Sequence, residues 1–364
     1  MIGRAVARVR PRAIEHNCAL LRDRLGDAEL CAVVKANGYG HGAEAAARAA
    51  LAGGATWLAV ATADEARDLR TSGIEAPVLV MGALTRADLD TALDARADVV
   101  AWTRELVEAA ASRASARVHV KLDSGMGRLG TKDPAEASSL CDLVAATDGL
   151  ELAGLMTHFA TADEPGDDHF PAQLAAFRAL VDDVRAAHPG VTVHAANSAA
   201  VLREPAAHFD MARCGIAIYG LDPFGNDPAD HGLEPALALE SYVAAVKRFD
   251  PGDSAGYGRT WRAREATCVA VLPVGYGDGW RRGLSNHADV LIRGRRHPLV
   301  GTVSMDNVTV DLGPETDVEP GDAAVLIGSQ GGERILAEEV ARRLGSINYE
   351  VTTGLLPRAV RVYE

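Results

Sequence analysis

Leu30-Cys-Ala-Val-Val-Lys35-Ala-Asn-Gly-Tyr-Gly-His-Gly42 passes from a short apolar run into a glycine-rich turn, and residues 43–51 follow with helical spacing. A buried strand that leads through a turn into a helix begins a βαβ unit. Lys35 stands at the end of the strand, where an amine is costly to bury unless it is paired or used in chemistry. Desolvation there would make it a competent nucleophile. From the residues alone, a lysine that merely extends its amine into solvent is the more frequent case.

This strand–helix pattern repeats along the first two-thirds of the chain. Short apolar runs alternate with segments of helical spacing at residues 64–71, 104–111 and 173–187. About eight such units predict an α/β fold, a (β/α)8 TIM barrel, which typically needs ~250 residues. A doubly wound open sheet is the structural alternative. The expected strands are residues 30–34, 56–61, 77–81, 98–102, 117–122, 152–156, 191–194 and 214–219.

The composition changes after residue 220. Residues 221–235 are rich in Pro, Asp and Gly and predict a linker, and the short strands beyond it predict a mainly β domain with one helix at residues 337–344. We therefore expect a barrel domain, residues 1–232, and a mainly β domain, residues 233–364. Residues 5–9 could form a strand of either domain. The expected strands of the second half are residues 241–246, 268–273, 290–292, 308–312 and 323–327.

Charge and cysteine content exclude several classes of protein. The net charge of −13 leaves no basic stripe, which argues against nucleic-acid binding. The chain has neither a signal-peptide pattern nor an apolar run of the ~20 residues that a membrane span needs, so we expect a cytoplasmic protein. No H-E-x-x-H or paired-cysteine spacing indicates a metal. The scattered cysteines, which predict neither disulfides nor a zinc site, are Cys18, Cys31, Cys141, Cys214 and Cys268.

The segment Lys35 to Gly42 strongly resembles the cofactor-lysine segment of alanine racemases, which are pyridoxal-phosphate enzymes of fold type III. The resemblance implies an isomerase that interconverts L- and D-alanine, the latter for peptidoglycan. Further matches follow in order along nearly the whole chain: Lys121-Leu-Asp-Ser-Gly-Met-Gly-Arg128, Thr157-His-Phe-Ala-Thr-Ala-Asp163, Ala196-Asn-Ser-Ala-Ala200, Arg213-Cys-Gly-Ile216, Tyr219-Gly220, Gly256-Tyr-Gly-Arg-Thr-Trp261, Pro273-Val-Gly-Tyr-Gly-Asp-Gly-Trp280, Gly301-Thr-Val-Ser-Met-Asp306 and Ile347-Asn-Tyr-Glu350.

The resemblance implies that Lys35 binds pyridoxal 5'-phosphate as a Schiff base. Ser198 can offer a hydroxyl and an amide N–H to the phosphate, and Gly215 permits close approach of the backbone. The other cofactor contacts that the resemblance implies are Tyr39, Arg128, His158, Asn197, Arg213, Ile216 and Tyr349.

Arg213 is expected on the pyridine nitrogen, where many pyridoxal enzymes have a carboxylate. A guanidinium only donates hydrogen bonds, so it should leave that nitrogen unprotonated and weaken carbanion delocalisation. The resemblance further implies that His158 supports Arg213 through a hydrogen bond. It assigns to Arg128 the cofactor phenolate and the substrate carboxylate, and makes Lys121 a candidate for carbamylation, which would turn a cation into an anion that orients Arg128.

Racemisation removes a proton from one face of the α-carbon and returns one to the other, for which two bases suffice. The resemblance implies Lys35 and Tyr257 as these catalytic bases. It also implies that Tyr257, Tyr276, Met305 and Asp306 come from a second subunit, where the last three contact substrate or narrow the pocket. We therefore expect a homodimer with two shared active sites and alanine as substrate.

Three alternatives remain open. A broad-specificity or serine racemase would keep Lys35 and Tyr257 but widen the pocket around Tyr276. A barrel-fold decarboxylase of basic amino acids would lack Tyr257 as a base and would place a carboxylate where Arg213 stands. A non-enzymatic cofactor-carrier barrel would lack the mainly β domain.

Overall fold

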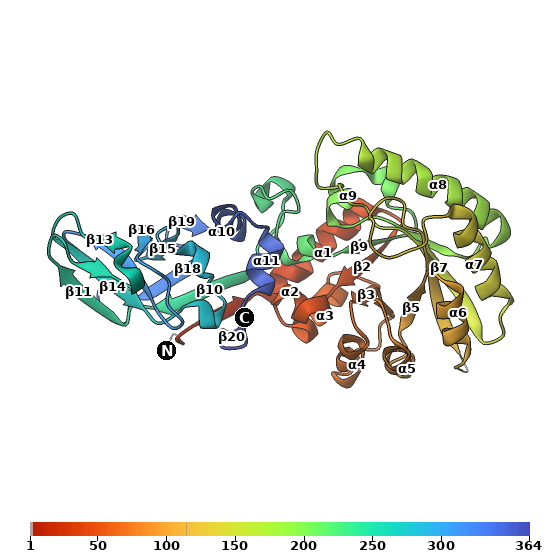
Figure 1. The fold of residues 1–364 in the computed structure, drawn as a ribbon, viewed down its shortest axis with the longest axis horizontal. Helices are drawn as coiled ribbons and strands as arrows, with labels where there is room; N and C mark the ends of the chain where they lie inside the picture. The colour runs from red at the N-terminus through yellow and green to blue at the C-terminus, as the bar shows by residue number, and fades with distance from the viewer. Residues whose placement is uncertain (1–2, 114) are drawn as a thin grey trace.

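The first half of the chain folds into the predicted barrel, at the right of Figure 1. The computed structural model describes residues 3–113 and 115–364, and within them eight parallel strands close on one another because β9 pairs with β2. Several of these strands are buried on both faces, as parallel strands covered by helices are, which explains their uninterrupted apolar runs. The barrel strands are β2 (Glu29–Val33), β3 (Trp57–Val60), β4 (Val78–Val80), β5 (Asp98–Ala101), β6 (Ala116–Lys121), β7 (Leu150–Met156), β8 (Thr192–His194) and β9 (Met211–Cys214).

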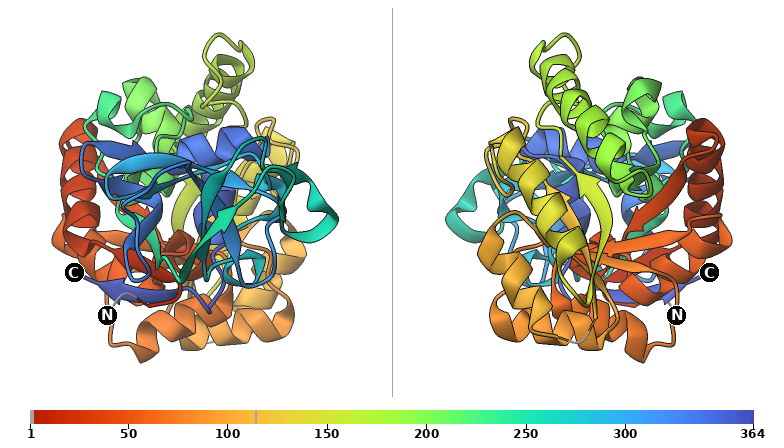
Figure 2. Two further views of the ribbon diagram at one scale, coloured as in Figure 1. Left: turned by 90° about the vertical axis from the view of Figure 1, so that its left-hand side faces the viewer. Right: turned by 90° about the vertical axis from the view of Figure 1, so that its right-hand side faces the viewer.

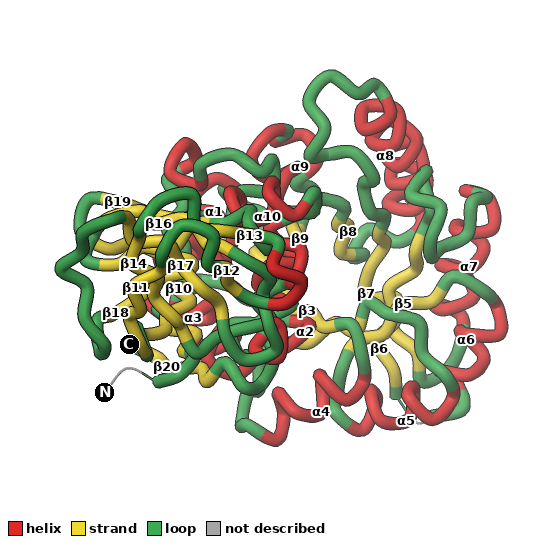
Figure 3. The backbone as a smooth tube through the Cα atoms, turned by 60° about the vertical axis from the view of Figure 1, so that its left-hand side comes forward, coloured by secondary structure: helices red, strands yellow, loops and turns green. Residues whose placement is uncertain are grey.

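Helices surround the barrel strands, and loops join them to the strand ends (Figure 3). Two of these helices begin with a capping box, in which a threonine and an acidic side chain three residues later satisfy each other's backbone N–H groups. No helix among residues 3–113 and 115–364 is long and apolar enough to cross a membrane. The helices of this half are α1 (Pro11–Leu25), α2 (Lys35–Tyr39), α3 (Ala43–Ala52), α4 (Ala63–Thr71), α5 (Arg86–Asp94), α6 (Arg104–Ala111), α7 (Pro134–Ala146), α8 (His169–Ala187) and α9 (Ser198–Arg203).

The second half forms the predicted mainly β domain, which lies in front of the barrel when the molecule is viewed along its long axis (Figure 2, left). Its main sheet has the order β11-β14-β17-β16-β15-β18-β10-β1-β20. The elements are β10 (Leu237–Tyr242), β11 (Ala245–Phe249), β12 (Ser254–Ala255), β13 (Trp261–Arg262), β14 (Thr267–Leu272), β15 (Asp289–Ile292), β16 (Arg295–Val300), β17 (Val308–Gly313), β18 (Ala323–Gln330), β19 (Glu333–Ile335), α10 (Ala337–Leu344), α11 (Asn348–Thr353) and β20 (Val360–Tyr363).

The N-terminal strand β1 (Val6–Val9) joins this second sheet, between β10 and β20. The sequence alone does not assign residues 5–9 to either domain. The pairing assigns β1 to the β domain, because β1 pairs along its length with two strands from the second half. Strand β1 thus belongs to the β domain although it precedes the barrel in the chain. The division at residues 232 and 233 otherwise stays a prediction.

The structure differs from the sequence expectations at several elements, of which three are described below. Residues 214–219 were expected as a strand, but β9 ends at Cys214 and Ile216–Tyr219 forms a 3₁₀ helix, η2. Every residue of η2 is buried, so hydrophobic periodicity could not separate a buried helical turn from a strand. The expected strand at 241–246 spans the break between β10 and β11. Strand β16 was not expected, because two arginines and a proline hide its pattern.

Candidate active site

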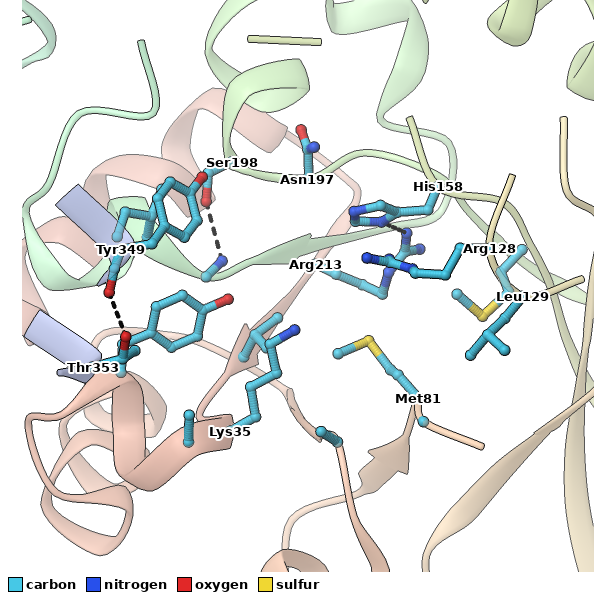
Figure 4. Close-up of a pocket in the computed structure, with 18 of the residues that line it drawn as sticks. Lys35, Met81, Arg128, Leu129, His158, Asn197, Ser198, Arg213, Tyr349 and Thr353 are labelled. Atoms are coloured by element: carbon cyan, nitrogen blue, oxygen red, sulfur yellow. Dashed lines mark hydrogen bonds between the residues drawn. The ribbon is translucent and has the colours of Figure 1, made fainter. Parts of the chain in front are cut away.

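A cavity of about 480 Å³ opens at the carboxyl ends of the barrel strands, where barrel enzymes carry their chemistry (Figure 4). Lys35 follows β2, Lys121 ends β6, and Arg213 lies in β9. The cavity brings together eleven residues that the sequence singled out: Lys35, Tyr39, Lys121, Arg128, His158, Asn197, Ser198, Arg213, Gly215, Ile216 and Tyr349.

The backbone directly after Lys35 is left-handed. Residues 36–39 have φ of 52°, 54°, 61° and 51°, a conformation that costs free energy at each non-glycine residue. The Glu65 carboxylate holds this turn, because it accepts the Ala36 N–H at 2.6 Å and the Ala61 N–H at 2.8 Å. It thereby ties the end of β3 to the residue next to Lys35. Sequence reasoning missed Glu65, although its capping-box position was visible.

Glu65→Ala is therefore expected to destabilise the fold more than loss of a helix cap alone. We expect a decrease of about 1–2 kcal/mol in the free energy of unfolding, since several backbone N–H groups lose their acceptor. Urea denaturation measures it. Asp88→Ala is the matched control, because Asp88 completes the capping box of α5 and carries no contact with the segment after Lys35. Equal losses in the two variants would show that the bond to Ala36 contributes nothing.

The Lys35 side chain points into the cavity in Figure 4. Burial, and next the nearby Arg128 guanidinium, lower the pKa of its amine, while Glu65 acts in the opposite direction. A larger share of the amine is therefore neutral near pH 7 than for a lysine in water, which suits a nucleophile or a base.

Arg213 is buried behind the cavity and its guanidinium is held from several sides. It donates to Thr157 O at 2.7 Å, to Ala195 O at 3.0 Å and to His194 Nδ1 at 2.7 Å. The hydrogen bond expected with His158 is present, at 3.2 Å to Nδ1. Burial, and next Arg213, place the pKa of His158 well below its ordinary value. The imidazole is neutral and accepts, which helps to fix the orientation of Arg213. Burial lowers the pKa of Arg213 to about 10, so the guanidinium still keeps its proton near pH 7.

The network behind Arg213 extends further than the sequence indicated. His194 lies 2.8 Å from His119, which lies 3.0 Å from Asp98, so a buried chain of hydrogen bonds crosses the barrel. Since His194 accepts from Arg213 through Nδ1, its Nε2–H donates to His119, whose own Nε2–H donates to the Asp98 carboxylate. Sequence reasoning missed these residues. Their signal in the sequence was one histidine in each of two expected barrel strands.

One end of the cavity is rich in N–H and O–H donors. Ser198 Oγ accepts the N–H groups of Gly215, at 3.1 Å, and Ala217, at 3.3 Å. Ser198 opens α9 and Ile216 opens η2, and the first N–H groups of a helix have no partner inside it. A Cβ at Gly215 would collide with the Tyr39 hydroxyl, so only glycine permits this approach. Such a cradle suits a phosphate.

Arg128 stands on a loop whose shape is fixed by Asp123. The Asp123 carboxylate accepts the N–H groups of Gly125 at 3.1 Å, Gly127 at 3.0 Å and Arg128 at 3.0 Å. Burial opposes its charged form, but these donors outweigh burial and lower its pKa. The loop thus presents the Arg128 guanidinium to the cavity while its backbone stays anchored.

The charge of the cavity is one-sided. Lys35, Lys121, Arg128 and Arg213 line it, and no Asp or Glu lies among its lining residues in the described chain. Anionic ligands with a phosphate or carboxylate group therefore fit it best.

Four of the site residues expected in the second half lie elsewhere, whereas Tyr349 lines the cavity. Tyr257, Tyr276, Met305 and Asp306 do not line the cavity of their own chain, as far as residues 3–113 and 115–364 describe it. Instead Tyr257 is 73%, Met305 49% and Tyr276 38% exposed on the β domain. A single chain thus holds the cationic half of the expected site and displays the other half on its surface.

The barrel, the β domain and the lysine at a strand end in a cationic cavity define a class of protein: a two-domain barrel enzyme whose cavity suits a ligand with a phosphate or carboxylate group. The chain matches the family model for the alanine racemase N-terminal domain over residues 9–223 and that for the C-terminal domain over residues 236–363. It belongs to the alanine racemase family, a family of pyridoxal-phosphate-dependent isomerases.

Individual relatives match over nearly their whole length. The alanine racemase of Symbiobacterium thermophilum is 43% identical over 364 residues, covering 98% of this chain and 96% of the relative. That of Mycobacterium ulcerans is 43% identical, covering 96% and 92%. Among solved structures, the alanine racemase of D-cycloserine-producing Streptomyces lavendulae superposes with a TM-score of 0.94 at 34% identity, covering 100% of this chain and 98% of that one.

Proposed function

We propose that this protein interconverts L- and D-alanine, and that it supplies D-alanine for peptidoglycan in the cytoplasm. The observation that carries the proposal is the Lys35 amine in a cavity that also holds Lys121, Arg128 and Arg213 and no carboxylate among its described lining residues. A decarboxylase of basic amino acids would need a carboxylate where the buried Arg213 stands. A carrier barrel would lack the β domain that this chain has.

The donors of the cavity fit pyridoxal 5'-phosphate. The phosphate would be held by the cradle of Ser198, Gly215 and Ile216 and by the phenols of Tyr39 and Tyr349. Asn197, which directly precedes Ser198, also lines the cavity. When bound, the cofactor supplies an electron sink that makes the α-proton of an amino acid removable. Arg213, oriented by its acceptors, would donate to the ring nitrogen and leave that nitrogen without a proton of its own.

Other residues would bind the substrate, transfer the α-proton and narrow the pocket. Arg128 binds the substrate carboxylate through its planar fork of donors. Lys35 anchors the cofactor and moves the α-proton on one face, and Tyr257 of a second subunit moves it on the other. Tyr276 and Met305 of that subunit narrow the approach so that the small alanine side chain is preferred. The protein therefore works as a homodimer with two shared sites, which is consistent with the exposure of these side chains in one chain.

Lys121 is proposed to carry a carbamate. Burial, and next the guanidinium groups of Arg213 and Arg128, lower the pKa of its amine to about 8. The neutral amine attacks the carbon of CO₂, a C–N bond forms, and one proton leaves to solvent. The resulting anion stabilises Arg128, whereas an unmodified, charged Lys121 would repel it.

At fixed dissolved CO₂, the carbamate is expected to accumulate as pH rises through about 8, because only the neutral amine reacts. ¹³C NMR of the holoenzyme supplied with ¹³CO₂ measures this. Lys121→Ala is the control and should lack the signal. A signal that persists in Lys121→Ala, or that falls as pH rises, would contradict the assignment.

The proposed activity is tested by incubating the purified, cofactor-loaded protein with L-alanine, L-serine and L-lysine and following the enantiomer ratio. Since enantiomers have equal free energies, L-alanine should approach equal amounts of both forms. L-Serine should react far more slowly and L-lysine not at all. Comparable rates for serine would indicate a broad-specificity racemase, and decarboxylation of lysine would overturn the proposal.

A further inference from the structure

Two arginines and two aspartates form a charged cluster on the β domain, which we call the clamp: Arg4, Arg358, Asp278 and Asp306. Arg4 contacts Asp278 at 2.7 Å and Asp306 at 3.2 Å. Arg358 contacts the same carboxylates, at 3.1 Å and 2.6 Å. Each arginine therefore bridges both aspartates, and each aspartate both arginines.

The fold explains why two like charges lie side by side here. Strands β1 and β20 are parallel neighbours in which Val6 pairs with Val360. Arg4 and Arg358 each lie two residues before these partners. Because the strands are parallel, both arginines lie at the same end of the two strands. Alone they would repel each other, and the two aspartates between them offset that repulsion.

The aspartates belong to two loops that the clamp holds together. The Asp278 side chain is fully buried, and its second oxygen accepts the Gly275 N–H at 2.9 Å. The loops also bond directly, from Tyr276 N–H to Ser304 O at 3.0 Å and from Gly277 N–H to Met305 O at 2.9 Å. A Cβ at Gly275 would collide with Ser304 O, so the loops are in close contact.

These loops carry Tyr276 and Met305, which are both exposed. None of the clamp residues lines the cavity of its own chain within the described residues. An ordered pair of loops that displays apolar side chains outward suits a contact with another molecule.

We propose that the clamp positions Tyr276 and Met305 to complete the pocket of the other subunit. The inference rests on the shared site proposed above. It gives Asp306 a different role from the substrate contact expected from the sequence: Asp306 acts through Arg4 and Arg358, as a positioning residue. Loss of one clamp arginine should therefore impair the partner's pocket and leave the cofactor cavity of its own chain intact.

The first test compares Arg358→Ala, Arg358→Lys and Arg293→Ala as dimeric holoenzymes. Arg293 is a matched control, since it also bridges two aspartates of the β domain, Asp322 at 2.7 Å and Asp317 at 3.2 Å. We expect Arg358→Ala to lower kcat/KM roughly 10- to 100-fold, the effect of small misplacement in an active site. Cofactor retention should not change, Arg358→Lys should recover part of the loss, and Arg293→Ala should resemble wild type. Equal kcat/KM in Arg358→Ala and Arg293→Ala would overturn the proposal.

The second test separates action on the partner from action on the same chain. Lys35→Ala and Arg358→Ala chains with different tags are co-expressed, and the mixed dimer is purified. It contains one pocket in which intact Lys35 faces an intact clamp from the other subunit. We expect about half the wild-type activity per dimer, from that one complete site of two. Activity no higher than that of the Arg358→Ala dimer would mean that the clamp acts within its own chain, or only on stability.

A Lys35→Ala/Tyr257→Phe mixed dimer shows whether a failed test counts against the clamp alone or against the shared active site as well. If this dimer recovers activity and the Arg358→Ala mixture does not, the shared site stands and only the clamp proposal fails. If neither mixture recovers, the shared site itself fails, and the clamp proposal fails with it.

Discussion

Lys35→Ala is expected to abolish alanine racemisation, with a fall of at least roughly a thousandfold, the range of a general base. The variant removes the amine that lies just after β2 at the cavity. It thereby removes both the proposed covalent anchor of the cofactor and one of the two proposed bases. Its purified form should also lose the yellow absorbance of a lysine-bound cofactor after gel filtration. That second readout does not depend on turnover.

Lys35→Arg and Lys132→Ala are the controls. The first keeps a cation in place but cannot act as the same nucleophile. The second removes an exposed lysine outside the cavity and should leave absorbance and activity unchanged. If Lys35→Ala kept the absorbance band, another amine would be the anchor, and Lys121 would be the first candidate because it lines the same cavity.

The barrel was predictable because local signals agreed along the chain. Strand β3 is apolar throughout, β5 is apolar after Asp98, and the helices between them carry their own caps. The same logic failed at residues 214–219, where β9 gives way to the buried turn η2. There every residue is buried, so the side chains are apolar whether the backbone forms a strand or a 3₁₀ helix.

The cavity residues were predictable one by one from the family resemblance, but their supports were not. Glu65 lies 29 positions from Ala36, and the chain from Arg213 to Asp98 exists only through the register of several strands. The clamp is a similar case: Arg4 and Arg358 meet because β1 and β20 are adjacent. Long-range pairing of this kind leaves no periodic trace in the sequence.

Tyr257→Phe is expected to reduce racemisation roughly 100- to 10,000-fold while leaving a one-sided exchange reaction. The substitution removes the phenol that serves the L-enantiomer and leaves Lys35, which serves the D-enantiomer, in its cavity. Cofactor absorbance should remain at the wild-type level, because Lys35 and the other residues proposed to hold the cofactor are unchanged. In deuterated water, the variant should therefore exchange the α-proton of D-alanine without inverting it.

Proton NMR of D- and L-alanine incubated separately with the variant reads this out, with Tyr242→Phe in β10 as a control that should behave like wild type. Loss of the α-proton signal from D-alanine alone supports the assignment of Lys35 and Tyr257 to opposite faces. Exchange into L-alanine alone would reverse the faces. Full racemisation by Tyr257→Phe would mean that one base serves both faces, so the exposed phenol would not be needed for the proton transfer.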